Sequence, residues 1–129
     1  MPKPTAAANA APMPAPKVPH YAAALSFMAL RKPRGHGIDH WAVSPTGSYS
    51  ADYETGERLA GEFLTFIGTY PTVCHSTLLT CVLKDMIDHA VTGQGWSGVH
   101  AGFASGVTRY AMATARIVVS QMDGEATHA

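Results

Sequence analysis

Three side chains that can take part in acid–base or metal chemistry, Cys81, Asp85 and His89, recur every four residues. In a helix this spacing turns a thiol, a carboxylate and an imidazole toward one flank. These are ligand types that zinc and other transition ions accept. The outer two side chains lie about 12 Å apart along such a helix, so the realistic pair is Asp85 with His89. A metal site would need further ligands from the other histidines, His36, His40, His75 or His100.

A plainer interpretation of the same flank needs no metal. Asp85 and His89 then form an exposed hydrogen-bonded pair, and Cys81 is a small apolar residue. The chain has no HExxH motif and no paired CxxC motif. We therefore predict no metal and no other cofactor. A metal-binding protein or metal-dependent enzyme built from Asp85, His89 and the loop histidines is the alternative.

A second group of chemically capable residues, His36, Asp39 and His40, lies in a glycine-flanked loop. Histidine titrates near neutral pH and binds metals readily, but seven histidines in 129 residues produce such neighbours by chance. Cys74 and His75 are adjacent, so on a helix they point apart and form no dyad. The motifs GxSxG and GxxxxGK[ST] are absent. The glycine-rich string GQGWSG at 93–98 has the GxGxxG spacing, but no predicted strand precedes it and no lysine follows the glycines, so we interpret it as a connecting turn. The sequence favours a non-enzymatic role over an enzymatic one.

The charge balance narrows the choice of partners. Nine basic and nine acidic residues give a formal net charge of zero, and only 14% of residues are charged. Such a chain has no excess field to attract phosphate backbones, so nucleic-acid binding is disfavoured. Low net charge weakens the repulsion between copies, which favours self-association. No run approaches the ~20 apolar residues of a membrane span, so we expect no membrane partner.

The elements that must position these residues are helices. We predict a short helix at 21–32, a helix capped by Ser50 from about residue 51 to 67, a helix from 72 or 76 to 91, and a helix from Ser97 to about 119. Gly93 is expected to cap the third helix in a left-handed conformation, and Gly124 to end the ordered chain. Apolar residues recur at helical spacing in the last three of these segments. They are Tyr53, Gly56, Ala60, Phe63, Leu64 and Ile67; Leu79, Val82, Leu83, Met86, Ile87 and Ala90; and Val99, Phe103, Val107, Tyr110, Thr114 and Ile117.

These segments predict an all-α fold, a small bundle of three to four helices over residues 20–122. Residues 1–19 contain six of the nine prolines among mainly alanines, which predicts a disordered tail. Residues 123–129 are expected to fray. The N-terminal stretch has no apolar core typical of a secretory signal. We therefore expect free thiols at Cys74 and Cys81, and a cytoplasmic location.

Three glycines, Gly98, Gly102 and Gly106, repeat every four residues along the last predicted helix. Each glycine inside a helix costs about 0.8–1 kcal/mol relative to alanine, so a close contact must compensate. The spacing leaves open whether that contact is internal packing, a second subunit or a ligand. We call these three residues the glycine ridge.

The function that these residues favour is protein interaction. Trp41, Tyr49 and Tyr53 are aromatic anchors in or beside an irregular loop over residues 33–51, and such anchors often carry binding energy. With the glycine ridge they predict a module that self-associates or docks on a protein partner, as a regulator or inhibitor. A small-ligand binder with a pocket between helices is a further possibility.

Overall fold

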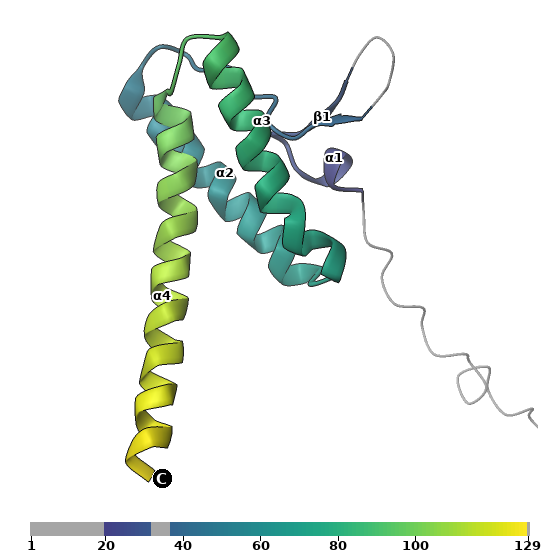
Figure 1. Ribbon diagram of the computed structural model, residues 1–129. Helices are drawn as coiled ribbons and strands as arrows, with labels where there is room; N and C mark the ends of the chain where they lie inside the picture. The colour runs from purple at the N-terminus through teal and green to yellow at the C-terminus, as the bar shows by residue number, and fades with distance from the viewer. Residues whose placement is uncertain (1–19, 32–36, 129) are drawn as a thin grey trace, which may run out of the picture.

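The computed structural model describes residues 20–31 and 37–128 (Figure 1). The chain is mostly helical, as predicted, with one small two-stranded sheet. The predictions for residues 1–19 and for His36 lie outside the described residues. In chain order the elements are α1 (Tyr21–Ala24), β1 (Ala29–Leu30), β2 (Ile38–Asp39), α2 (Tyr49–Thr69), the 3₁₀ helix η2 (Val73–Thr77), α3 (Leu78–Thr92) and α4 (Gly98–His128).

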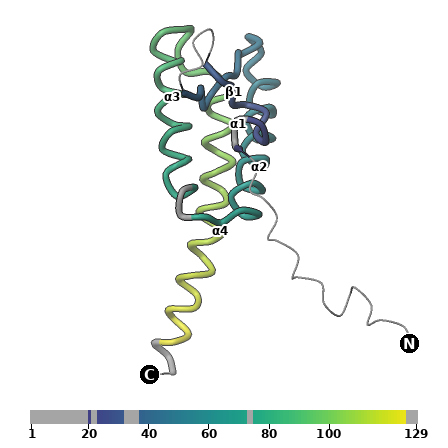
Figure 2. The backbone as a smooth tube through the Cα atoms, turned by 90° about the vertical axis from the view of Figure 1, so that its right-hand side faces the viewer, coloured from purple at the N-terminus to yellow at the C-terminus, as the bar shows by residue number. Residues whose placement is uncertain are grey.

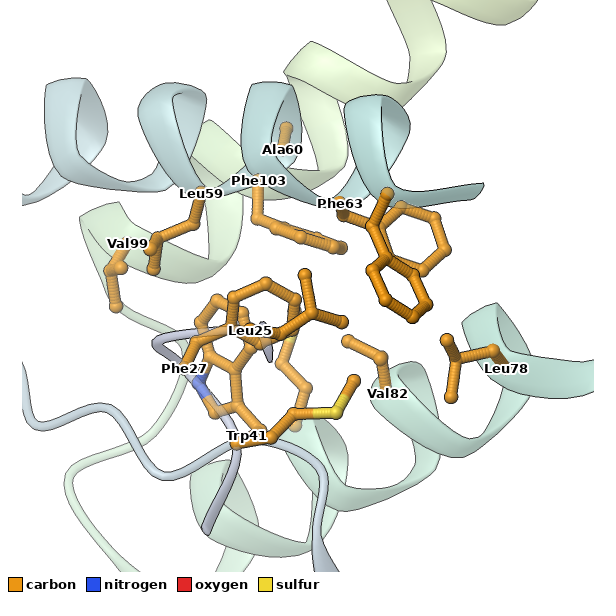
Figure 3. Close-up of a cluster of buried hydrophobic side chains, with 13 residues drawn as sticks. Leu25, Phe27, Trp41, Leu59, Ala60, Phe63, Leu78, Val82, Val99 and Phe103 are labelled. Atoms are coloured by element: carbon orange, nitrogen blue, oxygen red, sulfur yellow. The ribbon is translucent and has the colours of Figure 1, made fainter. Parts of the chain in front are cut away.

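One hydrophobic core lies between α2, α3, the first part of α4 and the segment that precedes them (Figure 3). Aromatic rings form its centre. Phe103 packs against Trp41 with ring centroids 5.1 Å apart and against Phe63 at 5.9 Å. Val82 of α3 lies on the other side of the core (Figure 3), and Met86 of the same helix is also buried. Each of these five side chains is at most 1% exposed. Their burial removes large apolar surfaces from water, which is the main contribution to the stability of the fold.

The helix predicted at 21–32 is wrong beyond Ala24, where α1 ends. The chain then turns so that Leu25, Phe27 and Met28 enter the core. The carbonyl of Phe27 accepts the amide of Ala42 at 2.7 Å. After this turn β1 pairs antiparallel with β2. The predicted helix is therefore shorter here, because burying three side chains from so short a segment requires an extended path.

The start of α2 also differs from the prediction. The helix begins at Tyr49 with Ser48 at its N-cap, and no side chain caps it from that position. Asp52, which is 4% exposed, instead accepts hydrogen bonds from the amide and hydroxyl of Thr46 and from the amide of Gly47. The Thr46 hydroxyl is the main cause of a lowered pKa at Asp52, and burial opposes it. Asp52 thus fixes the loop that enters the helix.

The face of α3 is rotated relative to the prediction. Leu78, Val82 and Met86 are buried, whereas the predicted core residues Leu83 and Ile87 are 37% and 55% exposed. Fewer apolar side chains of α3 are therefore buried than the sequence predicted.

The turn after α3 also differs. Gly93 ends the helix with φ −114°. The left-handed residue is Gly95, at φ +85°, whose amide donates to the carbonyl of Ala90. Positive φ at position 95 is the conformation that glycine adopts at least cost, so the turn is closed two residues later than predicted.

Helix α4 is the longest element, 31 residues against 21 for α2. Gly124 does not end it, and the helix continues to His128. Its second half runs beyond the ends of α2 and α3 and projects from the rest of the molecule (Figures 1 and 2). None of the helices over residues 20–31 and 37–128 has a stretch apolar and long enough for a membrane span.

Candidate functional site

The glycine ridge of α4 packs against α2 of the same chain. A Cβ atom at Gly98 would collide with the carbonyl of Tyr49, and one at Gly102 with the carbonyl of Tyr53. A Cβ at Gly106 would lie 2.6 Å from that of Ala60. The two helices therefore touch backbone to backbone over two turns. Internal packing supplies the close contact that the ridge required.

A fourth glycine completes this contact from the side of α2. Gly56 is buried, and a Cβ there would lie 2.6 Å from the backbone nitrogen of Phe103. The same close approach brings the Tyr53 hydroxyl within 2.7 Å of Ser105 Oγ, to which it donates. Arg109 forms an ion pair with Glu57 one turn further on. Toward the C-terminal half of α4 the two helices separate (Figure 1).

The three predicted aromatic anchors do not form one patch. Trp41 is 0% exposed and belongs to the core, so it has no surface with which to contact a partner. Tyr49 is 63% exposed, and its ring stacks on that of Tyr53 at 6.2 Å. The two tyrosines lie at the start of α2 beside the glycine ridge. Their binding to a partner stays a prediction.

Two reciprocal acid–histidine pairs join the β hairpin to α3. Asp85, 4% exposed, accepts from the backbone amide of His40 and lies 2.9 Å from the Nδ1 atom of the same residue. Arg31 reaches the other carboxylate oxygen at 3.4 Å. In the second pair the histidine lies on α3 and the acid on the hairpin: His89 Nε2 lies 2.9 Å from both oxygens of Asp39. Asp85 and His89 therefore do not bond to each other as predicted but bind separate residues of the hairpin.

The carboxylate of Asp85 is held in its charged form. Burial alone would raise its pKa, but the amide and imidazole of His40 and the charge of Arg31 outweigh burial, so the pKa is lowered. The neighbouring Asp39 also accepts the amide of Trp41 at 3.1 Å. Together these contacts clamp the hairpin to α3 and set Trp41 at the entry to the core.

A groove of about 410 Å³ runs beside this clamp. Its ionisable side chains already have partners: Arg31 with Asp85, Asp39 with His89, and Asp88 with Lys84. Within residues 20–31 and 37–128, no three His, Cys, Asp or Glu side chains converge on a point that would suit a metal ion. Cys81 is a half-buried free thiol. His36, a predicted ligand, lies outside the described residues.

His100 is a buried polar residue, and its burial was not predicted from the sequence. It is 3% exposed and lies between two indoles, with centroid distances of 4.9 Å to Trp96 and 5.7 Å to Trp41. Its Nδ1 accepts the backbone amide of Ser97 at 2.9 Å, as the third residue of a capping box does. Burial lowers the pKa of His100, and the nearby His89 adds to this effect. Its Nε2 finds no hydrogen-bond partner among the described residues.

The second half of α4 carries half of the exposed large apolar side chains among the described residues, and their exposure was not predicted from the sequence. Every residue from Thr108 to Asp123 is exposed. Six large apolar side chains of this segment are 47–61% exposed: Tyr110, Met112, Ile117, Val118, Val119 and Met122. We call residues 108–128 the α4 extension. The sequence prediction assigned all the apolar residues of the last helix to the core. The last predicted helix is longer than the predicted helix before it that becomes α2, and this difference could have indicated that part of its apolar surface has nothing to pack against.

Comparison with known proteins supplies no relative. The sequence matches no protein family, and no curated protein or solved structure is significantly similar to it.

Proposed function

We propose that this protein is a small, non-enzymatic helical interaction module, and that the α4 extension is its docking surface. The observation that carries the proposal is the exposure of six large apolar side chains on a helix that leaves the body of its own chain. Exposed large apolar side chains gathered on one element mark interaction sites in soluble proteins more often than single scattered ones do. A module of this type acts as a regulator or inhibitor by occupying the surface of another protein.

The physics of an isolated helix supports this role. Residues 108–128 span about 30 Å, and a helix of that length without tertiary contacts is only marginally stable in water. Packing of an apolar face against another protein supplies the missing stability. A helix of the partner laid along the extension would continue the α2–α4 pairing beyond the point where α2 diverges.

The remaining candidates for an interaction surface support the proposal less directly. The glycine ridge is covered by α2, and Trp41 lies in the core. Tyr49, which is 63% exposed, and its stacking partner Tyr53 are available at the opposite end of α4 from the extension. They provide a second point of contact for a partner that reaches along the whole helix.

The metal alternative is supported less well. Asp85 and His89 each have a partner in the hairpin, and a metal ion would have to displace both pairs. A site of this kind would also need a further ligand from His36, His40, His75 or His100, and no three such side chains converge on one point within residues 20–31 and 37–128. We therefore interpret the ionisable side chains that line this groove as the contacts that hold the hairpin against α3.

The proposal is tested with the purified full chain. We expect light scattering to show association that rises with concentration, or affinity capture to return a defined protein partner, and either to be lost when Val118 is replaced by aspartate. Association and capture that are both unchanged by Val118→Asp would overturn the proposal. About one zinc, iron or copper ion per chain, lost in His89→Ala, would instead favour the metal alternative.

A further inference from the structure

We infer that the cavity beside the first turn of α4 binds a small oxyanion, of the class of inorganic phosphate, sulfate or a simple carboxylate, through the Nε2–H group of His100. The cavity has a volume of about 270 Å³. It lies between the turn that links α3 to α4 and the segment that precedes α2, and His100 forms part of its wall. Because this is the opposite end of α4 from the extension, the inference stands apart from the proposed docking surface.

The contact between His100 and Ser97 determines where the imidazole carries its proton. The backbone amide of Ser97 donates to Nδ1 at 2.9 Å, so Nδ1 holds a lone pair and no proton. Burial lowers the pKa of His100, which keeps the ring neutral at neutral pH. A neutral imidazole has a single N–H group, and in His100 this group is therefore at Nε2.

This Nε2–H group is a buried donor without an acceptor. His100 is 3% exposed, and its Nε2 atom has no hydrogen-bond partner among the described residues. Buried polar groups in folded proteins nearly always have a partner, and an exception calls for an explanation such as a bound ion. An oxygen atom of a bound anion would satisfy this donor.

The other contacts of the ring leave the Nε2 edge as the part that meets the cavity. The indoles of Trp96 and Trp41 pack on the imidazole, with centroid distances of 4.9 and 5.7 Å. Ser97 occupies the ring at Nδ1. Since His100 lines the cavity, it does so with the remaining edge, which carries Nε2. A ligand at this edge is shielded from water by the two indoles, which strengthens a hydrogen bond to it.

The charges around the cavity favour an anion over a cation. None of the described residues that line it is acidic, and Asp39, which pairs with His89, lines the neighbouring groove instead. The first turn of α4 brings the positive end of the dipole of a 31-residue helix to this place, and helix N-termini readily bind oxyanions. A metal ion would need a bare nitrogen at Nε2, which the protonated atom does not offer.

The size of the cavity and its other polar groups also suit a small oxyanion. Its volume is below the roughly 300–1,000 Å³ of pockets that hold larger organic ligands. The Ser44 hydroxyl and the Gln94 amide lie on the wall and are able to donate to further oxygens of the anion. Both side chains are exposed, so the anion enters from the side on which they lie.

The first test uses the two tryptophans as reporters. Trp41 and Trp96 are the only tryptophans of the chain, and both contact His100. Sodium phosphate, sulfate and acetate are each titrated into the purified full chain at neutral pH, with sodium chloride holding the ionic strength constant. We expect a saturable change of fluorescence with at least one of the three oxyanions. No saturation with any of them at millimolar concentrations would overturn the inference, since water alone would then satisfy Nε2–H.

Heteronuclear NMR of the histidine side chains observes the donor itself. We expect a signal of the Nε2–H tautomer for His100, identified by its loss in His100→Gln, and we expect the bound oxyanion to shift it. A proton at Nδ1, or an Nε2–H signal that no oxyanion moves, contradicts the inference. Loss of the Nε2–H signal on addition of zinc at equimolar concentration would show a cation site instead.

A pair of charge variants tests the place of the site. Ser44→Asp puts a carboxylate on the wall of the cavity, where it repels an anion and competes for Nε2–H, so affinity should fall at least about tenfold. Ser120→Asp adds the same charge at an exposed position in the second half of α4, outside the cavity, and should bind like the parent chain. Equal affinity in the two variants would refute the site.

His100→Phe removes the donor and keeps an aromatic ring between the two indoles. Binding should be lost in this variant, and retained binding would show that Nε2–H is not the donor. Far-UV circular dichroism checks that each variant folds. If His100→Phe does not fold, Ser44→Asp and Ser120→Asp decide the matter, because both changes are at exposed positions.

Discussion

The α-carbon of Gly102 in α4 lies against the backbone carbonyl of Tyr53 in α2, so closely that no side chain fits between the two helices. This contact joins the two halves of the fold, and it fixes the point from which α4 leaves the body. The stability of the domain should therefore be unusually sensitive to one added methyl group at this position.

The first prediction concerns that methyl group. Gly102→Ala should lower the free energy of unfolding by about 1–3 kcal/mol or more, because a backbone carbonyl cannot move aside as a flexible side chain can. Better helix propensity recovers at most about 1 kcal/mol of this loss. Urea denaturation followed by circular dichroism measures the change.

Gly61→Ala is the matched control for this substitution. Gly61 lies within α2, is exposed, and a Cβ there would meet nothing within 4 Å. It should stabilise the domain by up to about 1 kcal/mol through helix propensity alone. Equal effects at positions 102 and 61 would show that the two helices do not touch at the ridge.

The second prediction concerns the clamp between hairpin and α3. Asp85→Ala leaves the amide and imidazole of His40 without their buried acceptor, which should cost about 1.5–3 kcal/mol. Thermal unfolding measures the loss. Asp88→Ala on the same helix removes only an exposed pair with Lys84, worth less than about 0.5 kcal/mol. A comparable loss at both positions would contradict the buried role of Asp85.

The pH dependence of the same clamp follows from the lowered pKa of Asp85. Above the ordinary carboxyl value of 3.8 the folded and unfolded chains both carry the charge, and the stabilisation is fully present. As pH falls below that value the unfolded chain is protonated first, so stability is lost. Asp85→Asn should flatten the acid limb of a plot of unfolding free energy against pH, and an unchanged limb would refute this.

His100 provides a prediction at milder pH. Burial lowers its pKa below the ordinary imidazole value of 6.5. Above that value both states are neutral, and as pH falls through 6.5 toward the folded pKa the unfolded chain binds the proton first. Stability should therefore fall between about pH 7 and pH 5.

The control for this effect is His100→Gln. Glutamine at the third position of a helix can still accept the amide of Ser97, as in a capping box, but it does not titrate. The variant should keep its fold at pH 7 and lose the decline between pH 7 and pH 5. Melting temperatures over this range decide the matter, and a decline that persists in His100→Gln must arise from another histidine.

The last prediction concerns the stability of the domain when most of the α4 extension is removed. A chain ending after Ala111 keeps the pair between Arg109 and Glu57 but lacks the exposed residues beyond it. At a concentration low enough to keep the full chain monomeric, its unfolding free energy should change by less than about 0.5 kcal/mol. A much larger loss would mean that the extension folds back onto the body.

Much of the helical framework could be predicted because local spacing determines it. The apolar period over α2 identified Gly56, Ala60 and Phe63, and all three are buried. The glycine spacing of α4 indicated a close backbone contact, and α2 provides it. Each of these predictions depends only on which residues share one face of a helix.

The errors arise where distant segments decide the outcome. The hairpin forms because Phe27 must reach Trp41 and Phe103 in the core, which no local propensity reveals. Asp85 pairs with His40, 45 residues earlier, rather than with the local His89. Tyr110 and Ile117 continue the apolar period of the core face, yet they are 56% and 61% exposed. The second half of α4 runs beyond α2 (Figure 1), and the sequence alone does not show where the two helices part.

Because α4 is a single unbroken helix from its contact with α2 to its far end, it works as a stiff strut once a partner packs on its extension and stabilises it. Whatever binds its tip is held about 30 Å from the glycine contact. A tilt of about 10° between α2 and α4 at that contact would move the tip by about 5 Å. Substitutions at the near end of the strut can therefore change the geometry of an assembly joined at the far end without altering a single residue that the partner touches.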